Sequence, residues 1–187
     1  WLKNDLQKES TKKAKYKIVL MHRGVYSTGP HYYYHQDISP LTNQLTSVMA
    51  ENDVDLVLQG HDHVYSLTYP IDKDGNISEI NYKNVYSKEI GSNISAMYNN
   101  KFPVYFIGDS IGLKHEAQLV FENNEYLVDT KMKKEYKNVL NKDNLNEYFS
   151  KFNIRATPYN SNYQCYGIFS SIEVNDNNLI VNSYTID

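Results

Sequence analysis

Two short apolar runs, with an amphipathic segment between them, constrain the fold of this chain most strongly. Residues 16–21 and 54–58 are rich in large apolar and β-branched side chains and have the length of buried strands. The segment between them has apolar residues at helical spacing, and Ser39-Pro40 provides a helix start: Leu41, Leu45, Val48 and Met49. A strand, a helix and a strand in this order predict a right-handed crossover with two parallel strands.

Three histidines follow these two predicted strands. His22 comes directly after the first run, and His61 and His63 come after the second, in Gly60-His61-Asp62-His63. The carboxyl ends of neighbouring parallel strands emerge at one edge of a sheet, so the three imidazoles should converge there. Any one of them alone is explained by a hydrogen-bonded turn. Together they predict a metal site, because neutral imidazole is the commonest protein ligand of transition metals.

The two histidine motifs, Val19-x-x-His22 and Gly60-His61-x-His63, resemble those of the calcineurin-like metallophosphoesterases, most closely the bacterial branch that is similar to purple acid phosphatases. Residues 1–6, 60–70 and 167–187 also resemble that family, whereas residues 115–160 do so weakly. The resemblance implies an α/β fold, a four-layer α/β/β/α sandwich with a mixed sheet and flanking helices. It also implies metal-dependent hydrolysis of phosphate monoesters or diesters, by a phosphatase or a phosphodiesterase.

The resemblance further assigns roles to four histidines, and the position of Arg23 directly after His22 suggests a role for a fifth residue. His22 and His61 would bind one metal ion and His63 a second, the two ions being Fe, Zn or Mn. Such a dinuclear centre clamps the phosphoryl group and activates a water molecule for attack. His31 would donate a proton to the leaving group, and Arg23 would hold phosphate oxygens with its planar guanidinium. A loop position for His31, and a surface or helix-capping contact for Arg23, are the simpler interpretations.

The family motifs that supply the bridging carboxylate, an Asp-x-His, a Gly-Asp and an Asn-His, are not found before Val19. We therefore expect residues 1–187 to be the C-terminal portion of one metallophosphoesterase domain, inactive alone, with a helical insertion at 130–160. Its partners would be a small phosphate ester and the missing N-terminal half. Gly108-Asp109 comes too late in the chain to replace the missing motif and is expected to be a turn. A mononuclear hydrolase with three histidine ligands and a non-catalytic binding module remain alternatives.

Composition narrows the class of partner. The formal net charge is −3 and the pI is about 6.1, so no basic surface for nucleic acid is expected. No apolar run approaches the roughly 18 residues that a membrane helix needs. An apolar sheet face without its partner sheet would be exposed, so the isolated chain should form a homo-oligomer. The sequence leaves the localisation undetermined; a secreted or cell-surface location follows only from the resemblance.

The remaining elements are predicted from turn residues and alternation. A hairpin turns at residues 72–76 between strands 65–71 and 77–82, and another strand covers 102–107. A second hairpin covers 118–129, helices cover 132–152, and a closing hairpin covers 168–186. In an extended segment Asp62 would point away from its two histidine neighbours. We therefore expect Asp62 to hydrogen-bond near the site rather than to bind metal.

Overall fold

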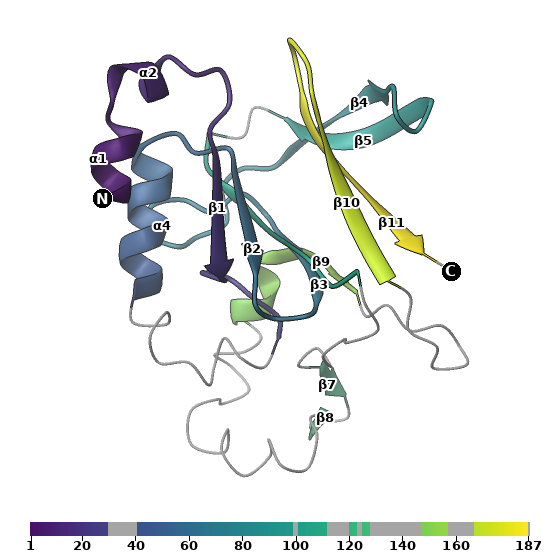
Figure 1. Ribbon diagram of the computed structural model, residues 1–187. Helices are drawn as coiled ribbons and strands as arrows, with labels where there is room; N and C mark the ends of the chain where they lie inside the picture. The colour runs from purple at the N-terminus through teal and green to yellow at the C-terminus, as the bar shows by residue number, and fades with distance from the viewer. Residues whose placement is uncertain are drawn as a thin grey trace.

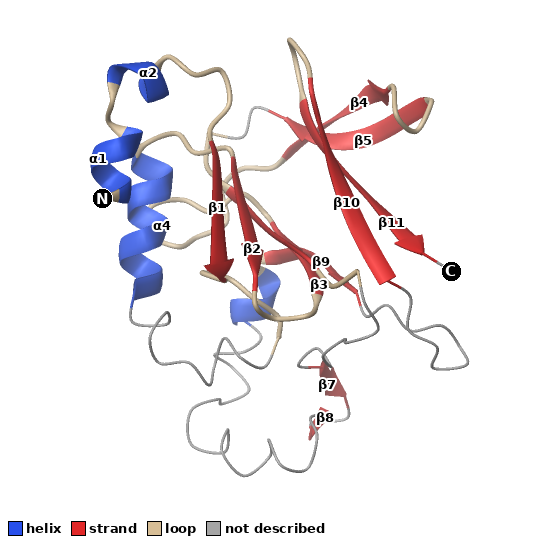
Figure 2. Cartoon of the chain, viewed as in Figure 1, coloured by secondary structure: helices blue, strands red, loops and turns tan. Residues whose placement is uncertain are grey.

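The computed structural model describes residues 1–29, 41–98, 101–111, 120–122, 125–127, 147–156 and 167–186. This part of the chain is a mixed α/β structure with one five-stranded mixed sheet, a few helices and several two-stranded hairpins (Figures 1 and 2). These elements confirm the mixed α/β class predicted from the sequence. In the described residues, no helix has both the length and the apolar character to cross a membrane.

The central sheet has the strand order β1-β2-β6-β3-β9. Its strands are β1 (Ile18–Arg23), β2 (Leu56–Gly60), β6 (Val104–Gly108), β3 (Tyr65–Thr68) and β9 (Phe152–Ala156). The pairs β1–β2 and β2–β6 are parallel, whereas β3 is antiparallel to both β6 and β9. The predicted parallel pair is thus confirmed, although each of its strands begins and ends two residues later than the apolar run suggested.

Helix α4 (Thr42–Glu51) makes the crossover from β1 to β2, as its apolar spacing predicted. This helix begins after Leu41, whose side chain makes no capping hydrogen bond. The predicted helix start at Ser39-Pro40 lies outside the described residues. Helices α1 (Leu2–Leu6) and α2 (Glu9–Lys12) precede β1. Helices α1 and α4 lie together on one side of the sheet (Figure 1).

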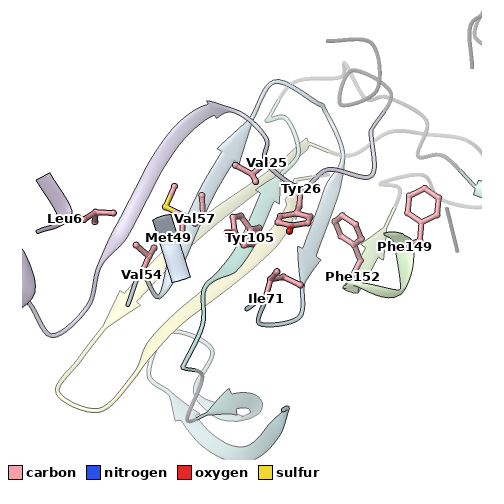
Figure 3. Close-up of a cluster of buried hydrophobic side chains, with 10 residues drawn as sticks. All are labelled: Leu6, Val25, Tyr26, Met49, Val54, Val57, Ile71, Tyr105, Phe149 and Phe152. Atoms are coloured by element: carbon pink, nitrogen blue, oxygen red, sulfur yellow. The ribbon is translucent and has the colours of Figure 1, made fainter. Parts of the chain in front are cut away.

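The core lies between these helices and the sheet (Figure 3). Its buried members come from helices, strands and loops far apart in the sequence: Leu6, Val25, Tyr26, Met49, Val54, Val57, Ile71, Tyr105, Phe149 and Phe152. Alternate residues of β1, Val19 and Met21, pack against this cluster. Their neighbours Ile18 and Leu20 point to the other face, where Ile18 is 40% exposed and Leu20 is 80% exposed.

Three hairpins complete the described structure. Strands β10 (Gly167–Val174) and β11 (Leu179–Ile186) form the predicted closing hairpin, and its first strand is joined to the end of β6 by a 3.0 Å hydrogen bond from Ile168 N–H to Ser110 C=O. The others pair β4 (Asn81–Ser87) with β5 (Ser92–Tyr98) and β7 (Val120–Glu122) with β8 (Glu125–Leu127).

Two predicted elements differ in the structure. The turn at 72–76 is present, but the only pairing across it in the described chain is one bridge between Ile71 and Ile77. β3 lies inside the central sheet, so its backbone groups bond to β6 and β9 instead of to the segment after the turn. Near the predicted end of the helical segment, residues 147–150 are helical, whereas Phe152 begins strand β9.

Candidate metal centre

The carboxyl ends of β1 and β2 bring two of the predicted ligands together. His22 is the penultimate residue of β1, and His61 directly follows β2. The parallel register between these strands shifts after Leu20, so that Arg23 lies opposite Gly60. Such an irregularity changes the direction of a side chain at the end of a strand. Here it lies in the segment that contains His22.

The two imidazoles of His22 and His61 meet through their ring nitrogens. Nε2 of His22 lies 3.2 Å from Nδ1 of His61, and the ring centroids are 5.1 Å apart with the planes at 79°. Two nitrogens that bind one tetrahedral zinc ion at about 2.0–2.1 Å lie about 3.3 Å from each other. The distance between the two nitrogens therefore suits a shared ion, and it equally suits a hydrogen bond between the two rings in which one nitrogen donates and the other accepts.

Gly60 permits this close approach of the two strand ends. A Cβ atom at Gly60 would lie 3.3 Å from the backbone oxygen of His22 and 3.7 Å from its Nδ1. The first of these distances is tighter than most real Cβ contacts, so a larger residue would push on the strand that carries His22. The glycine of the Gly60-His61-x-His63 motif thus has a steric role beside the imidazole of His22.

His61 adopts a backbone conformation that is rare for a residue with a side chain. Its φ is +75°, and the N–H of Asp62 donates a 3.0 Å hydrogen bond to the C=O of Gly60 across it. This combination is typical of the γ-turn with a positive central φ, which is uncommon and strained. Conformations of this kind cost about 1–3 kcal/mol and persist where the surrounding structure holds them.

Asp62 is one of the groups that hold this turn. Its side chain is buried, and the hydroxyl of Ser27 donates a short hydrogen bond to its Oδ2. Ser27 Oγ in turn accepts a 3.0 Å hydrogen bond from the N–H of Gly29. A Cβ atom on Gly29 would lie only 2.6 Å from Cβ of Asp62, so glycine is needed there. Asp62 thus makes the hydrogen-bonding contact that we expected of it.

Gln59, the residue before Gly60, was not singled out by the sequence. Its buried Oε1 accepts hydrogen bonds from the N–H groups of Val25 at 2.5 Å and Tyr26 at 3.1 Å. Its Nε2 donates a 2.8 Å hydrogen bond to the C=O of Tyr26. The amide therefore clamps the loop after β1 to the end of β2. The sequence signal for it was a single amide at the end of an apolar run.

The other predicted site residues are only partly placed. His63 is half-buried beyond Asp62, and Arg23 is half-buried at the end of β1. His31 lies outside the described residues. Within the described ranges, no three side chains of His, Cys, Asp or Glu form a group that could hold a metal ion. The structure therefore joins His22 to His61 but does not add His63 to that pair.

The end of β6 reaches the same edge of the sheet. β6 is parallel to β2, so its last residue Gly108 and the following Asp109 lie on the side where His61 follows β2. Asp109 has a φ of +64°, in the left-handed region of backbone conformation. No family model matches this chain, and no curated protein matches it at a significant level. The functional interpretation thus depends on the motifs and on the geometry of the histidine pair.

Proposed function

We propose that this chain belongs to a metal-dependent phosphoesterase, a phosphatase or phosphodiesterase with a dinuclear centre. The observation that supports this most is the 3.2 Å approach of His22 Nε2 to His61 Nδ1 at the carboxyl ends of two parallel strands. Ligand sites in open α/β sheets lie at this edge. In the same proposal, the central sheet and its covering helices are two layers of a four-layer α/β/β/α sandwich.

The proposed roles follow the order of the residues at this edge. His22 and His61 hold one ion, and His63 holds the second. The ions, when bound, supply positive charge that stabilises the phosphoryl group and the attacking and leaving oxygens. Arg23, which ends β1 beside the pair, binds phosphate oxygens, and His31 gives the leaving group its proton. The carboxylate that bridges the two ions comes from a part of the protein outside this sequence.

A second candidate is a non-catalytic binding module that keeps the fold. The described residues hold a histidine pair but no group of three ligands for a metal ion. A module of this kind would bind no catalytic metal even in the full-length product of the gene. The two candidates therefore differ in the metal content and the turnover of that longer protein.

The experiment measures metal content and hydrolysis of a chromogenic phosphate ester, using the full-length product and this chain. We expect two metal ions and turnover in the longer protein, and one ion without turnover in the chain alone. His22→Ala and His61→Ala in the longer protein should each abolish turnover. A full-length protein that contains no metal and hydrolyses no phosphate ester would refute the proposal and favour the binding module.

A further inference from the structure

We infer that Tyr148, Ser27 and Asp62 form a positioning chain that holds His61 against His22. The inference deepens the proposed function and rests on it, because it concerns the same pair of imidazoles. None of the three residues was assigned a ligand or a substrate contact. Their importance comes from a continuous series of hydrogen bonds between a distant segment and the γ-turn of His61.

The first contact joins residues that are far apart in the sequence. The hydroxyl of Tyr148 accepts a 2.9 Å hydrogen bond from the N–H of Ser27 and donates one of 3.0 Å to its C=O. One side chain thus satisfies both backbone groups of Ser27. The Tyr148 ring is fixed by aromatic packing against Tyr26 at 6.3 Å and Phe152 at 5.4 Å between centroids.

The second contact passes from the Ser27 backbone to its side chain. Ser27 is 1% exposed, so its hydroxyl cannot exchange a protein partner for water. It donates to Oδ2 of Asp62, which is itself 3% exposed. Gly29 packs closely against the same side chain, where a Cβ atom would lie 2.6 Å from Cγ of Asp62. Asp62 is therefore held in one position by the loop that follows β1.

The third step connects Asp62 to the imidazole. Asp62 closes the γ-turn by donating its N–H to Gly60, and His61 is the central residue of that turn with φ at +75°. Because such a turn is strained, its shape depends on how firmly its ends are held. Gln59 holds one end to the loop after β1, and Asp62 holds the other. Loss of either anchor should let His61 relax and change its distance from His22.

Positioning residues of this kind have measurable effects on metal sites. Side chains that orient metal ligands typically change metal affinity by about 10–100-fold when they are removed. We therefore expect Tyr148→Phe and Ser27→Ala each to weaken binding of Co²⁺ to this chain by about 10-fold or more. Asp62→Asn keeps an oxygen that can accept from Ser27, so it should bind Co²⁺ more tightly than Asp62→Ala.

The matched control is Tyr26→Phe. It also removes a buried tyrosine hydroxyl. That hydroxyl pairs with Thr46 at 3.1 Å and is not part of the positioning chain. Co²⁺ binding is followed by visible absorption, and thermal unfolding shows that each variant is folded. Since Tyr148 and Ser27 act in series, the double variant should lose little more affinity than Ser27→Ala alone. Binding by Tyr148→Phe and Ser27→Ala that equals binding by Tyr26→Phe would overturn the inference.

A second readout needs no metal and separates this inference from the proposed function. Nitrogen chemical shifts of the His22 and His61 rings are measured by NMR in the metal-free chain and in each variant. We expect both rings to shift in Ser27→Ala and Tyr148→Phe but not in Tyr26→Phe. If the wild-type chain binds no Co²⁺, the metal-centre proposal fails. The ring nitrogen shifts then test by themselves whether the positioning chain holds His61. Unchanged ring nitrogen shifts in both Ser27→Ala and Tyr148→Phe would refute the positioning chain.

Discussion

At the scale of single residues, the uncharged amide of Gln59 holds the loop after β1 beside the histidine pair. The Gln59 side chain is 8% exposed and makes three hydrogen bonds to the backbone of Val25 and Tyr26. Gln59→Leu would leave those backbone groups buried without these partners, at a cost of about 1–3 kcal/mol for each group that stays unsatisfied. We expect urea denaturation to show a loss of about 3 kcal/mol.

The control for Gln59 is a glutamine on the outside of helix α4. Gln44 is exposed, so Gln44→Leu should change the free energy of unfolding by no more than about 0.5 kcal/mol. A Gln59→Leu variant as stable as Gln44→Leu would show that the clamp between β2 and the loop after β1 does not contribute to stability.

Two neighbouring core tyrosines allow a second test at this scale. Tyr26 and Tyr105 pack edge to face, with centroids 4.7 Å apart, and the Tyr26 hydroxyl pairs with Thr46 at 3.1 Å. The Tyr105 hydroxyl is buried and makes no hydrogen bond of full geometry with the residues that the structure describes. Burial raises its pKa well above the ordinary value, and a weaker approach to Thr46 lowers it only in part. Tyr105→Phe should therefore be neutral or stabilising, whereas Tyr26→Phe should lose about 1 kcal/mol in urea denaturation. The reverse order would contradict this assignment of hydrogen bonds.

The sequence predicted that His22 and His61 meet and that Asp62 hydrogen-bonds beside them, but not the other residues that hold this turn. His22 and His61 were predictable because each follows an apolar run, and strand order then brings the runs together. Ser27 and Tyr148 are 121 positions apart and have no pattern in common. Their contact exists only once the segment that contains Tyr148 packs against the loop after β1, and local sequence does not encode that approach.

At the scale of elements, polar contacts dock the β4–β5 hairpin on the β10–β11 hairpin. Glu89, in the turn after β4, accepts hydrogen bonds from Ser171 at 2.7 and 2.8 Å and from Asn182 at 3.0 Å. Glu173 on β10 accepts a 3.1 Å hydrogen bond from Ser87. The two hairpins are thus joined by carboxylates on each side.

This docking should depend on pH. The hydrogen bonds from Ser171, followed by those from Asn182, lower the pKa of the Glu89 carboxyl in the folded protein. A lowered pKa stabilises the fold above the unfolded-state value of about 4.3, and that contribution is lost as the pH falls through the folded-state value. We expect Glu89→Gln to be less stable than wild type at neutral pH and equally stable in acid.

Thermal unfolding between about pH 7 and pH 3 measures this difference. Glu79→Gln is the control, because Glu79 is exposed and precedes β4. A stability difference between wild type and Glu89→Gln that stays constant over the whole range would rule out the carboxylate as its cause.

The elements also show where local patterns fail. The alternation in residues 65–82 and the turn at 72–76 predicted a hairpin, and the turn formed with Gly75 at φ +84°. The first arm pairs elsewhere because β3 bonds to strands on both of its sides, β6 and β9. Pairing with residues more than 35 positions away cannot be inferred from alternation, since alternation predicts a strand but does not specify its partner.

At the scale of the whole molecule, the central sheet ends on one side at β1. In the described residues β1 pairs only with β2, and its outer face carries Ile18 and Leu20, which are 40% and 80% exposed. An apolar strand at the edge of a sheet is a template for pairing with another chain. We therefore expect the isolated chain to self-associate through β1; the sequence suggested self-association, but through an exposed sheet face and not through this strand.

Sedimentation velocity over a range of concentrations tests this expectation. Leu20→Lys places a charge on the exposed strand and should convert dimers or larger species to monomers. Ile90→Lys is the matched control, because Ile90 is 47% exposed but lies between β4 and β5, away from the sheet edge. A wild-type chain that remains monomeric at high concentration would contradict self-association.

The central claim is that His22 and His61 share one metal ion, and titration calorimetry of this chain with Zn²⁺ tests it most directly. We predict one zinc ion bound per wild-type chain, with that binding lost in both His22→Ala and His61→Ala. His63→Ala should keep it, because Nε2 of His22 and Nδ1 of His61 are the atoms that lie 3.2 Å apart. Zinc binding that survives in both His22→Ala and His61→Ala would contradict the claim.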